Sequence, residues 1–419
     1  MGEMSDLRTR ALKVLPGGVS SNVRMPNRGT FIDHGRGSRL WDDQGREYID
    51  YLLGQGPAFL GHADPVVNEA VAGSVQRGMV FGAQHDLEVE AVESLLAAIG
   101  WADQARLGVS GTEAVQGALR LARSATGRRK VVRFAGQYHG WIDNVLMSFD
   151  LDGGHVASAG QVPDALEDWF VVEFNDTVAL EALFTSHGDE IAAVILEPMM
   201  CNSGAIPPRE GFLQFVRALT RRYRAALIFD EVITGFRLAL GGAAEFFGVA
   251  PDIAVFGKAI AGGWPVSAIA ATNEMWESVS SGATNHSGTF NASVMAAAAV
   301  RATIAQLTAH PPYSEIERLG SRLMTGIAAQ SDSIHVQGLP VAFHVSFGDS
   351  APVQTYSALG TLDLPRYARF SRTLAAHGLW VAERGIWYLS AAHTPEDIDE
   401  SLERFAAAFD EFDPAVSAR

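Results

Sequence analysis

Short apolar segments alternate with helix-length amphipathic segments through the middle of the chain. Apolar strands that are separated by helices are typical of a mostly parallel sheet covered by helices on both faces. We therefore predict an α/β fold, with a large domain at residues 61–295. The expected strands are residues 131–135, 169–174, 192–198, 226–232, 253–258 and 266–272.

The two ends of the chain show a different pattern. Segments rich in β-forming residues flank the turn Asp43-Gln44-Gly45, which predicts a hairpin. After residue 296 we expect an alanine-rich helix, mixed strands and a final amphipathic helix that begins near Pro395. Residues 1–60 and 296–419 are therefore predicted to form the N- and C-terminal parts of a smaller α+β domain.

Composition narrows the class of protein. Of the 419 residues, 47% are hydrophobic and 19% are charged, which is typical of a globular chain with a large core. The net charge of −16 disfavours nucleic acid and anionic membranes as partners. The single cysteine, Cys201, and an N-terminal segment without the apolar core of a signal peptide predict a cytoplasmic protein. We therefore expect small-molecule partners.

Residues 110–113 mark the beginning of a helix. Ser110 and Glu113 have the spacing of a capping box, and Gly111 and Thr112 lie between them. Exposed N–H groups at such a helix terminus can bind a phosphate, although most helix caps bind no ligand. The predicted buried face of the helix contains Val115, Ala118, Leu119 and Ala122.

Two charged residues lie at the ends of predicted buried strands. Asp230 ends the segment ALIFD, and Lys258 ends the segment IAVFGK. A buried carboxylate needs a partner or a function, and a lysine in apolar surroundings is shifted toward the neutral, nucleophilic amine. Each residue alone is equally compatible with a structural role, as a salt bridge or as a side chain that reaches the surface.

Together, the helix terminus, the aspartate and the lysine match the needs of pyridoxal phosphate. The lysine can form a Schiff base, the carboxylate can keep the pyridine nitrogen protonated, and the helix terminus can hold the phosphate. The sequence contains no P-loop, HExxH or CxxC motif, and GVSG at 108–111 does not match GxSxG. We predict this cofactor and no metal site.

A series of motifs runs in order from about Pro16 to Phe409: PGGVSSNVR, GPAFLGHADPVV, FGAQHDLEVE, SGTEAVQGALRLAR, FAGQYHGW, EPMMCNSGAIPP, LIFDEVITGFR, FGKAIAGGWPVSA and HSGTF. With these motifs the chain resembles the class III (subgroup II) pyridoxal-phosphate aminotransferases of fold type I. Within that family it is most similar to the glutamate-1-semialdehyde 2,1-aminomutases, and it shares features with β-amino-acid aminotransferases.

The resemblance implies a catalytic role for two residues. Lys258 is expected to be the Schiff-base lysine and the base that moves protons, and Asp230 is expected to pair with the pyridinium. A relative that only binds the cofactor would lack one of these residues, and both are present. For His139 and His62 we expect packing or hydrogen-bonding roles.

The resemblance also implies further cofactor contacts and a homodimer. Thr289 of HSGTF is expected to reach the phosphate of the neighbouring subunit, which would place the active site at the subunit interface. The remaining expected contacts are Ser110, Gly111 and Thr112 for the phosphate, Tyr138 and Val232 for the two faces of the ring, and Asn202 near the ring hydroxyl.

Substrate residues distinguish two activities. Arg24, beside Ser21, matches the carboxylate-binding arginine of the aminomutases, which favours a mutase. Gln55 replaces an aminomutase tryptophan, and Arg384 lies in a segment more similar to β-amino-acid aminotransferases, where an arginine binds a carboxylate. We therefore predict amino transfer between an amino acid or amine, including a β-amino acid, and a keto acid, aldehyde or ketone. The alternative is glutamate-1-semialdehyde 2,1-aminomutase, which forms 5-aminolevulinate by intramolecular transfer.

Overall fold

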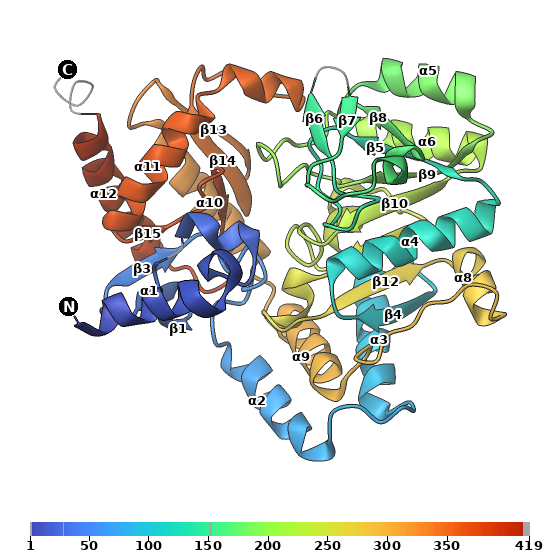
Figure 1. Ribbon diagram of the computed structural model, residues 1–419, viewed down its shortest axis with the longest axis horizontal. Coiled ribbons are helices and arrows are strands. Elements are labelled where there is room, and N and C mark those ends of the chain that lie inside the picture. Colours follow the sequence, from blue (N-terminus) through green and yellow to red (C-terminus); the bar gives the residue numbers. More distant parts are fainter. Residues whose placement is uncertain (1, 28, 151–152, 414–419) are drawn as a thin grey trace.

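The computed structural model describes residues 2–27, 29–150 and 153–413, and Figure 1 shows their arrangement. None of the described helices is long and apolar enough to cross a membrane. The α-helices are α1 (Gly2–Val14), α2 (Pro65–Ser74), α3 (Asp86–Ile99), α4 (Gly111–Thr126), α5 (Thr177–His187), α6 (Phe212–Tyr223), α7 (Gly242–Phe247), α8 (Asn273–Ser280), α9 (Val294–Ala309), α10 (Tyr313–Ala328), α11 (Leu364–Ala376) and α12 (Pro395–Phe412).

A seven-stranded sheet forms the larger region of the molecule. Strands β9, β10 and β11 are parallel neighbours, as are β9, β5 and β8, whereas β12 is antiparallel to both β11 and β4. The predicted mostly parallel sheet is therefore confirmed. In spatial order the strands are β4 (Gln104–Gly108), β12 (Ser267–Ala271), β11 (Ile253–Phe256), β10 (Ala226–Glu231), β9 (Ile191–Leu196), β5 (Lys130–Phe134) and β8 (Trp169–Val172).

Helices cover both faces of this sheet. On β10, Leu227 and Phe229 belong to the apolar cluster that includes residues of α6, whereas Ile228 belongs to the cluster of α4. Because side chains alternate along a strand, a strand buried on both faces is apolar throughout. This is the physical reason why continuous apolar segments identified six strands of the sheet. The edge strand β4 was missed, because it is only partly buried and its sequence, QARLG, is not apolar throughout.

The second region joins the two ends of the chain. Strands β2 and β3 form the predicted hairpin around residues 43–45, and Ile49 pairs with Leu379 in a parallel register. Helix α12 begins at Pro395 as predicted, with a capping box between Thr394 and Asp397. The domain limits at residues 60 and 295 stay predictions. The two sheets of this region contain β1 (Ile32–Arg36), β2 (Arg39–Asp42), β3 (Glu47–Asp50) and β15 (Leu379–Trp380), and β13 (Ile334–Leu339), β14 (Ala342–Phe347) and β16 (Ile386–Tyr388). A further pair, β6 (Ser148–Asp150) and β7 (Gly153–His155), lies beside β8 in the larger region (Figure 1).

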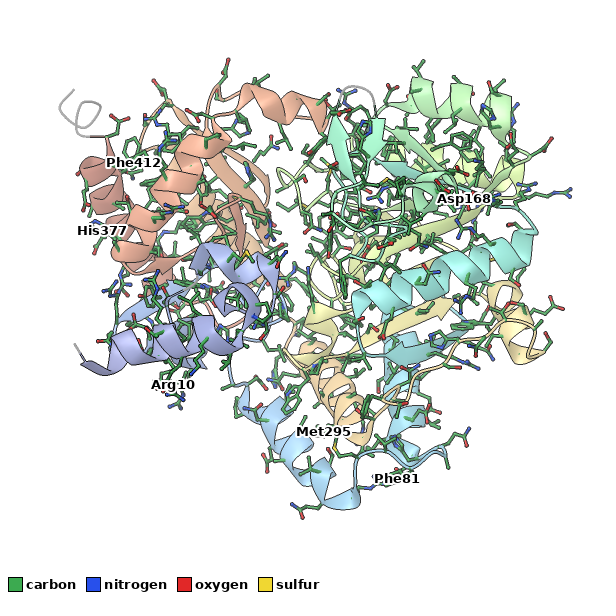
Figure 2. The ribbon with its side chains drawn as sticks, in the orientation of Figure 1. Arg10, Phe81, Asp168, Met295, His377 and Phe412 are labelled. Atoms are coloured by element: carbon green, nitrogen blue, oxygen red, sulfur yellow. The ribbon has the colours of Figure 1, made fainter. Side chains whose placement is uncertain are left out.

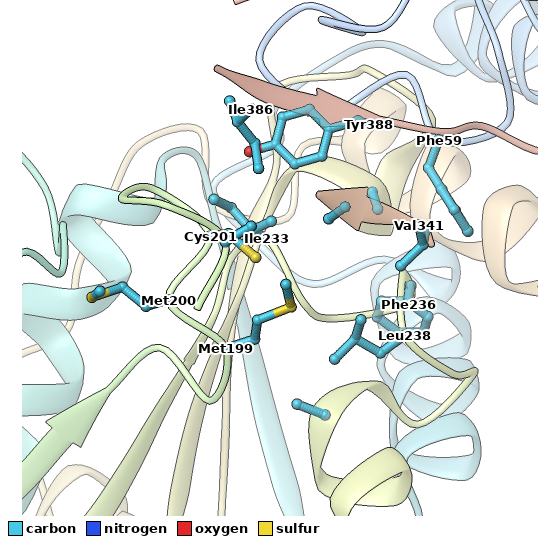
Figure 3. Close-up of a cluster of buried hydrophobic side chains, with 14 of the residues drawn as sticks. Phe59, Met199, Met200, Cys201, Ile233, Phe236, Leu238, Val341, Ile386 and Tyr388 are labelled. Atoms are coloured by element: carbon cyan, nitrogen blue, oxygen red, sulfur yellow. The ribbon is translucent and has the colours of Figure 1, made fainter. Parts of the chain in front are cut away.

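The two regions share buried apolar contacts near the carboxyl ends of β9 and β10. Figure 3 shows Ile386 and Tyr388 of β16 in one cluster with Cys201 and Ile233, which follow β9 and β10 along the chain. The C-terminal segment is thereby held beside the loops that leave the central sheet.

Candidate functional site

A cavity of about 160 Å³ lies beyond the carboxyl ends of the parallel strands. Ligands of open α/β sheets bind at this edge, because the strand ends and the following loops converge there. Most of the predicted cofactor residues line the cavity, and Ser110 and Thr289 do not. The lining consists of Gly111, Thr112, Val115, Tyr138, His139, Gly140, Glu197, Asn202, Asp230, Val232, Ile233, Thr234 and Lys258.

Lys258 begins a short 3-10 helix, residues 258–261, which is separated from β11 by Gly257. Its φ of 47° lies in the left-handed region, which is strained for a residue with a side chain. Burial, followed by the positive charge of Arg384, lowers the pKa of Lys258 to about 8. At pH 7 on the order of a tenth of the side chain is therefore the unprotonated, nucleophilic amine, far more than for a lysine with the usual pKa of 10.5.

Asp230 and His139 form a hydrogen-bonded pair at the cavity. Nδ1 of His139 lies 2.8 Å from Oδ2 of Asp230, and the backbone N–H of Val232 donates to Oδ1 at 3.2 Å. Burial lowers the pKa of His139, so the ring is neutral and the Nδ1 tautomer can donate to the carboxylate. The histidine thus has the hydrogen-bonding position expected from the sequence, and it orients Asp230.

The N-terminus of α4 forms one wall of the cavity. Oγ of Ser110 accepts a hydrogen bond from the N–H of Glu113 at 3.3 Å, as its spacing predicted, and lies outside the cavity lining. A Cβ at Gly111 would lie 3.1 Å from Cγ2 of Val232, so this position requires a small residue. The exposed N–H groups of this helix terminus favour an anionic ligand.

The loop that follows β5 closes against the same helix. Gly140 has a φ of 115°, and a Cβ there would lie 2.8 Å from Oγ1 of Thr112. Only glycine combines this conformation with so close an approach. Tyr138 of the same loop is 47% exposed and stands at the rim of the cavity.

These residues fit pyridoxal phosphate. The glycine-lined helix terminus suits a phosphate, the oriented Asp230 suits a protonated ring nitrogen, and the amine of Lys258 suits an aldehyde. In the described ranges, no group of three or more His, Cys, Asp or Glu side chains is arranged to hold a metal ion.

Two predicted substrate residues lie beside Lys258. Nη1 of Arg384 donates to Oε1 of Gln55 at 2.8 Å. The next residue, Gly56, runs along the lysine, since a Cβ at Gly56 would lie 3.6 Å from Cδ of Lys258. Gln55 and Gly56 both have positive φ values, 75° and 102°, and this tight turn brings Gly56 beside Lys258. Gln55 and Arg384 are outside the lining of the cavity itself.

Ser21, Arg24 and Thr289 also lie outside the lining of this cavity. Ser21 and Arg24 are exposed near a 3-10 helix at residues 22–27 and do not line the cavity. Thr289 is exposed and lines a second cavity with residues 79–85. Their substrate and partner-phosphate roles stay predictions.

We did not predict a role for Glu197 and Arg237, two buried charged residues near the site. Glu197 lines the cavity, and it directly follows the apolar strand β9, as Asp230 ends the apolar segment of β10. Arg237 stacks between the rings of Phe59 and Tyr388 at 5.1 and 4.9 Å and donates to the carbonyl of Gly56. The sequence does show Glu197 as a charged residue directly after an apolar strand, which is a signal for a functional role. Arg237 has no such signal, because the residues that surround it are remote in the sequence.

The sequence is similar to a known protein family and to its members over nearly the whole chain. The family model described as "Aminotransferase class-III" matches residues 20–409. Glutamate-1-semialdehyde 2,1-aminomutase from Alkaliphilus oremlandii is 38% identical over 98% of this chain and 99% of the relative.

Solved structures extend the comparison. An omega-transaminase from Sphaerobacter thermophilus has a TM-score of 0.91 at 30% identity and covers 98% of this chain and 97% of its own. The β-phenylalanine aminotransferase of Variovorax paradoxus has a TM-score of 0.86 at 29% identity over 99% of this chain and 98% of its own. A transaminase with pyridoxal phosphate bound has a TM-score of 0.90 at 29% identity and covers 99% of both chains.

Proposed function

The chain belongs to the class III aminotransferases, which are pyridoxal-phosphate enzymes of fold type I, and we propose that it transfers an amino group between two separate substrates. The donor is an amino acid or amine, including a β-amino acid, and the acceptor is a keto acid, aldehyde or ketone. The observation that carries this proposal is the position of Arg384, which is held by Gln55 beside Lys258.

The side chains around the cavity have different roles in the proposed reaction. When bound, the cofactor supplies an electrophilic carbon and a ring that accepts electrons. Nζ of Lys258 is the nucleophile for that carbon and the base that takes a proton from the substrate and returns it. Asp230, which His139 orients, would accept a hydrogen bond from the protonated ring nitrogen of the bound cofactor. The N-terminus of α4 binds the phosphate through Gly111 and Thr112.

Tyr138, Val232 and Asn202 complete the cofactor contacts in this proposal. Tyr138, Val232 and Asn202 line the cavity. When the cofactor is bound, Tyr138 and Val232 would pack on the two faces of the ring, and Asn202 would lie near the ring hydroxyl. Ser110, which caps α4, holds the phosphate-binding helix terminus in place.

Arg384 determines the substrate class. Its guanidinium is exposed and donates a hydrogen bond to the neutral amide of Gln55. A carboxylate pairs with a guanidinium more strongly than a neutral amide does, so an acidic substrate can replace Gln55 as the partner. Arg24 and Ser21 provide a second carboxylate site only if their exposed segment moves to the cavity or faces the cavity of a partner subunit.

We further propose a homodimer in which Thr289 reaches the phosphate of the neighbouring subunit. The loop around Thr289 exposes Phe290 at 61%, and the neighbouring residues 79–81 are also exposed and apolar. Figure 2 shows Phe81 on the loop between α2 and α3, at the edge of the molecule. Contiguous exposed apolar side chains favour a protein interface. A monomer by light scattering at micromolar concentration would contradict this assembly.

Absorbance spectroscopy tests the proposed transfer. The violet band of the lysine-linked cofactor is followed while single donors are added to the purified protein. We expect a β-amino acid or amine to bleach the band and a keto acid to restore it. A band that responds to no donor and acceptor pair would contradict intermolecular transfer.

The aminomutase is the second candidate, because its relative from Alkaliphilus oremlandii is 38% identical over nearly the full length of both chains. A mutase would convert glutamate-1-semialdehyde to 5-aminolevulinate without an added amino acceptor. That result would show that the departures at Gln55 and Arg384 do not prevent intramolecular transfer.

A further inference from the structure

Glu197 accepts four hydrogen bonds at the edge of the cavity, although it is only 3% exposed. Oε1 accepts from the backbone N–H of Tyr138 at 2.8 Å and from Nδ2 of Asn202 at 3.1 Å. Oε2 accepts from the backbone N–H groups of Cys201 and Asn202 at 3.0 and 3.3 Å. One carboxylate therefore satisfies donors from two separate loops.

These two loops carry residues that line the cavity. Tyr138 lies in the loop after β5, and Asn202 lies in the loop after β9. The side chain of Gln137 reinforces the connection, because its Oε1 accepts from the N–H of Glu197 at 2.9 Å and its Nε2 donates to the carbonyl of Glu197 at 3.0 Å. The position of each loop relative to the other thus depends on Glu197.

The stability of the folded chain does not explain why a carboxylate is buried at this position. Burial, followed by the negative charge of Asp230, raises the pKa of Glu197 to about 7, and the N–H donors only partly oppose this shift. A buried charge beside another carboxylate is a poor source of folding free energy compared with an apolar core residue. The buried carboxylate is best explained by the two loops that its hydrogen bonds hold in position.

We propose that Glu197 is a positioning residue that fixes Tyr138 and Asn202 on the cavity and thereby sets the orientation and affinity of the bound cofactor. The inference rests on the proposed function, because it takes this cavity as the cofactor site. It extends that proposal to a residue that acts through its neighbours and is given no contact with the reacting atoms.

The test is the variant Glu197→Gln, measured by cofactor binding to the apoprotein. A carboxamide keeps the shape but offers one acceptor oxygen, and its NH₂ group faces N–H donors. We expect the Kd for pyridoxal phosphate to rise on the order of tenfold or more, with a shifted absorbance maximum of the bound cofactor. An unchanged Kd and an unchanged spectrum would overturn the proposal.

Asp42→Asn is the matched control. Asp42 is also a buried carboxylate, which accepts from the N–H groups of Gln44 and Arg46 and from the hydroxyl of Tyr48, but it lies on β2 outside the cavity lining. We expect the thermal stability of the Asp42→Asn protein to fall, while its Kd for pyridoxal phosphate stays within about twofold of the parent value. An equal loss of affinity in both variants would show that Glu197 acts only through global stability.

Two further variants keep the test decisive if Glu197→Gln does not fold. Gln137→Met releases the backbone of Glu197 without changing its carboxylate or the cavity lining, and a smaller rise in Kd is expected. A double-mutant cycle combines Gln137→Met with Asn202→Ala, whose effects should be less than additive. Unchanged affinity in Gln137→Met, or full additivity, would refute the positioning role.

Lys258→Ala separates this inference from the assignment of the site. If that variant keeps the violet band, the cavity is not the cofactor site and the proposed function fails. If it loses the band while Glu197→Gln binds as the parent does, only the positioning role fails.

Discussion

The guanidinium of Arg384 donates to the side-chain oxygen of Gln55 at 2.8 Å, although 329 positions separate the two residues. The contact joins the segment before β16 to the turn that runs beside Lys258. A cation is thereby held next to the reactive amine, where its charge helps to lower the pKa of Lys258.

Arg384→Ala should discriminate between substrates. For donors and acceptors that carry a carboxylate, kcat/KM should fall by about tenfold to a hundredfold, as expected for the loss of a charge-assisted hydrogen bond of ~1.5–3 kcal/mol. Plain amines should lose little. Steady-state kinetics with matched acid and amine pairs provides the measurement, and Arg372→Ala, which removes another exposed arginine of the C-terminal region, serves as the control. Equal losses for acids and amines would remove Arg384 from the substrate site.

Lys258→Ala should abolish the violet band and lower turnover by at least 10²–10⁴-fold, the contribution of a general base. The measurement is the absorbance spectrum together with the steady-state rate. Lys130→Ala serves as the control, because Lys130 donates to the carbonyl of Glu167 away from the cavity and its loss should leave the spectrum unchanged. Retained turnover in Lys258→Ala would contradict its assignment as nucleophile and base.

The rate of cofactor attachment should depend on pH through Lys258. Attachment requires the neutral amine, and the folded pKa of about 8 lies below the usual 10.5. The rate should therefore rise between pH 7 and 9, with a midpoint near pH 8. Stopped-flow absorbance on the apoprotein measures it.

The same experiment on Arg384→Ala examines the cause of that shift. Removing the positive charge stabilises the ammonium form, so the midpoint should move to higher pH. A midpoint that is identical in the two proteins would show that Arg384 does not influence the amine.

Gly140→Ala should weaken cofactor binding by more than its backbone strain explains. Its φ of 115° disfavours a side chain, and the new Cβ would lie 2.8 Å from Oγ1 of Thr112, which lines the cavity. We expect the Kd for pyridoxal phosphate to rise about tenfold, equivalent to ~1.4 kcal/mol.

Gly160→Ala is the control for strain. Gly160 has a φ of 85° and no heavy atom within 4 Å of an added Cβ, so this variant bears the backbone strain without a collision. Its Kd should stay near the parent value. Isothermal titration of both apoproteins makes the comparison, and equal losses would contradict a specific effect on Thr112.

The sequence by itself determined the class of fold and the centre of the chemistry. Strands buried on both faces must be apolar along their length, so β9 and β10 were visible as continuous segments. Desolvation makes a charge at the end of such a strand costly, so Asp230 and Lys258 stood out without coordinates. The motifs around them led to the family and the cofactor that the comparisons show.

Only the tertiary structure decided which of the remaining polar residues act together. The contact between Gln55 and Arg384 and the hydrogen bond from the N–H of Tyr138 to Glu197 depend on loops that meet in space and not along the chain. The other three hydrogen bonds of Glu197 come from Cys201 and Asn202, four and five positions further along the chain. Arg24 and Arg384 were both predicted carboxylate partners, for the mutase and for the aminotransferase respectively, and of the two the fold places Arg384 beside Lys258 in this chain. The reason is physical, because hydrogen bonds act over about 3 Å and the periodicity of a sequence carries no information about distances between remote segments.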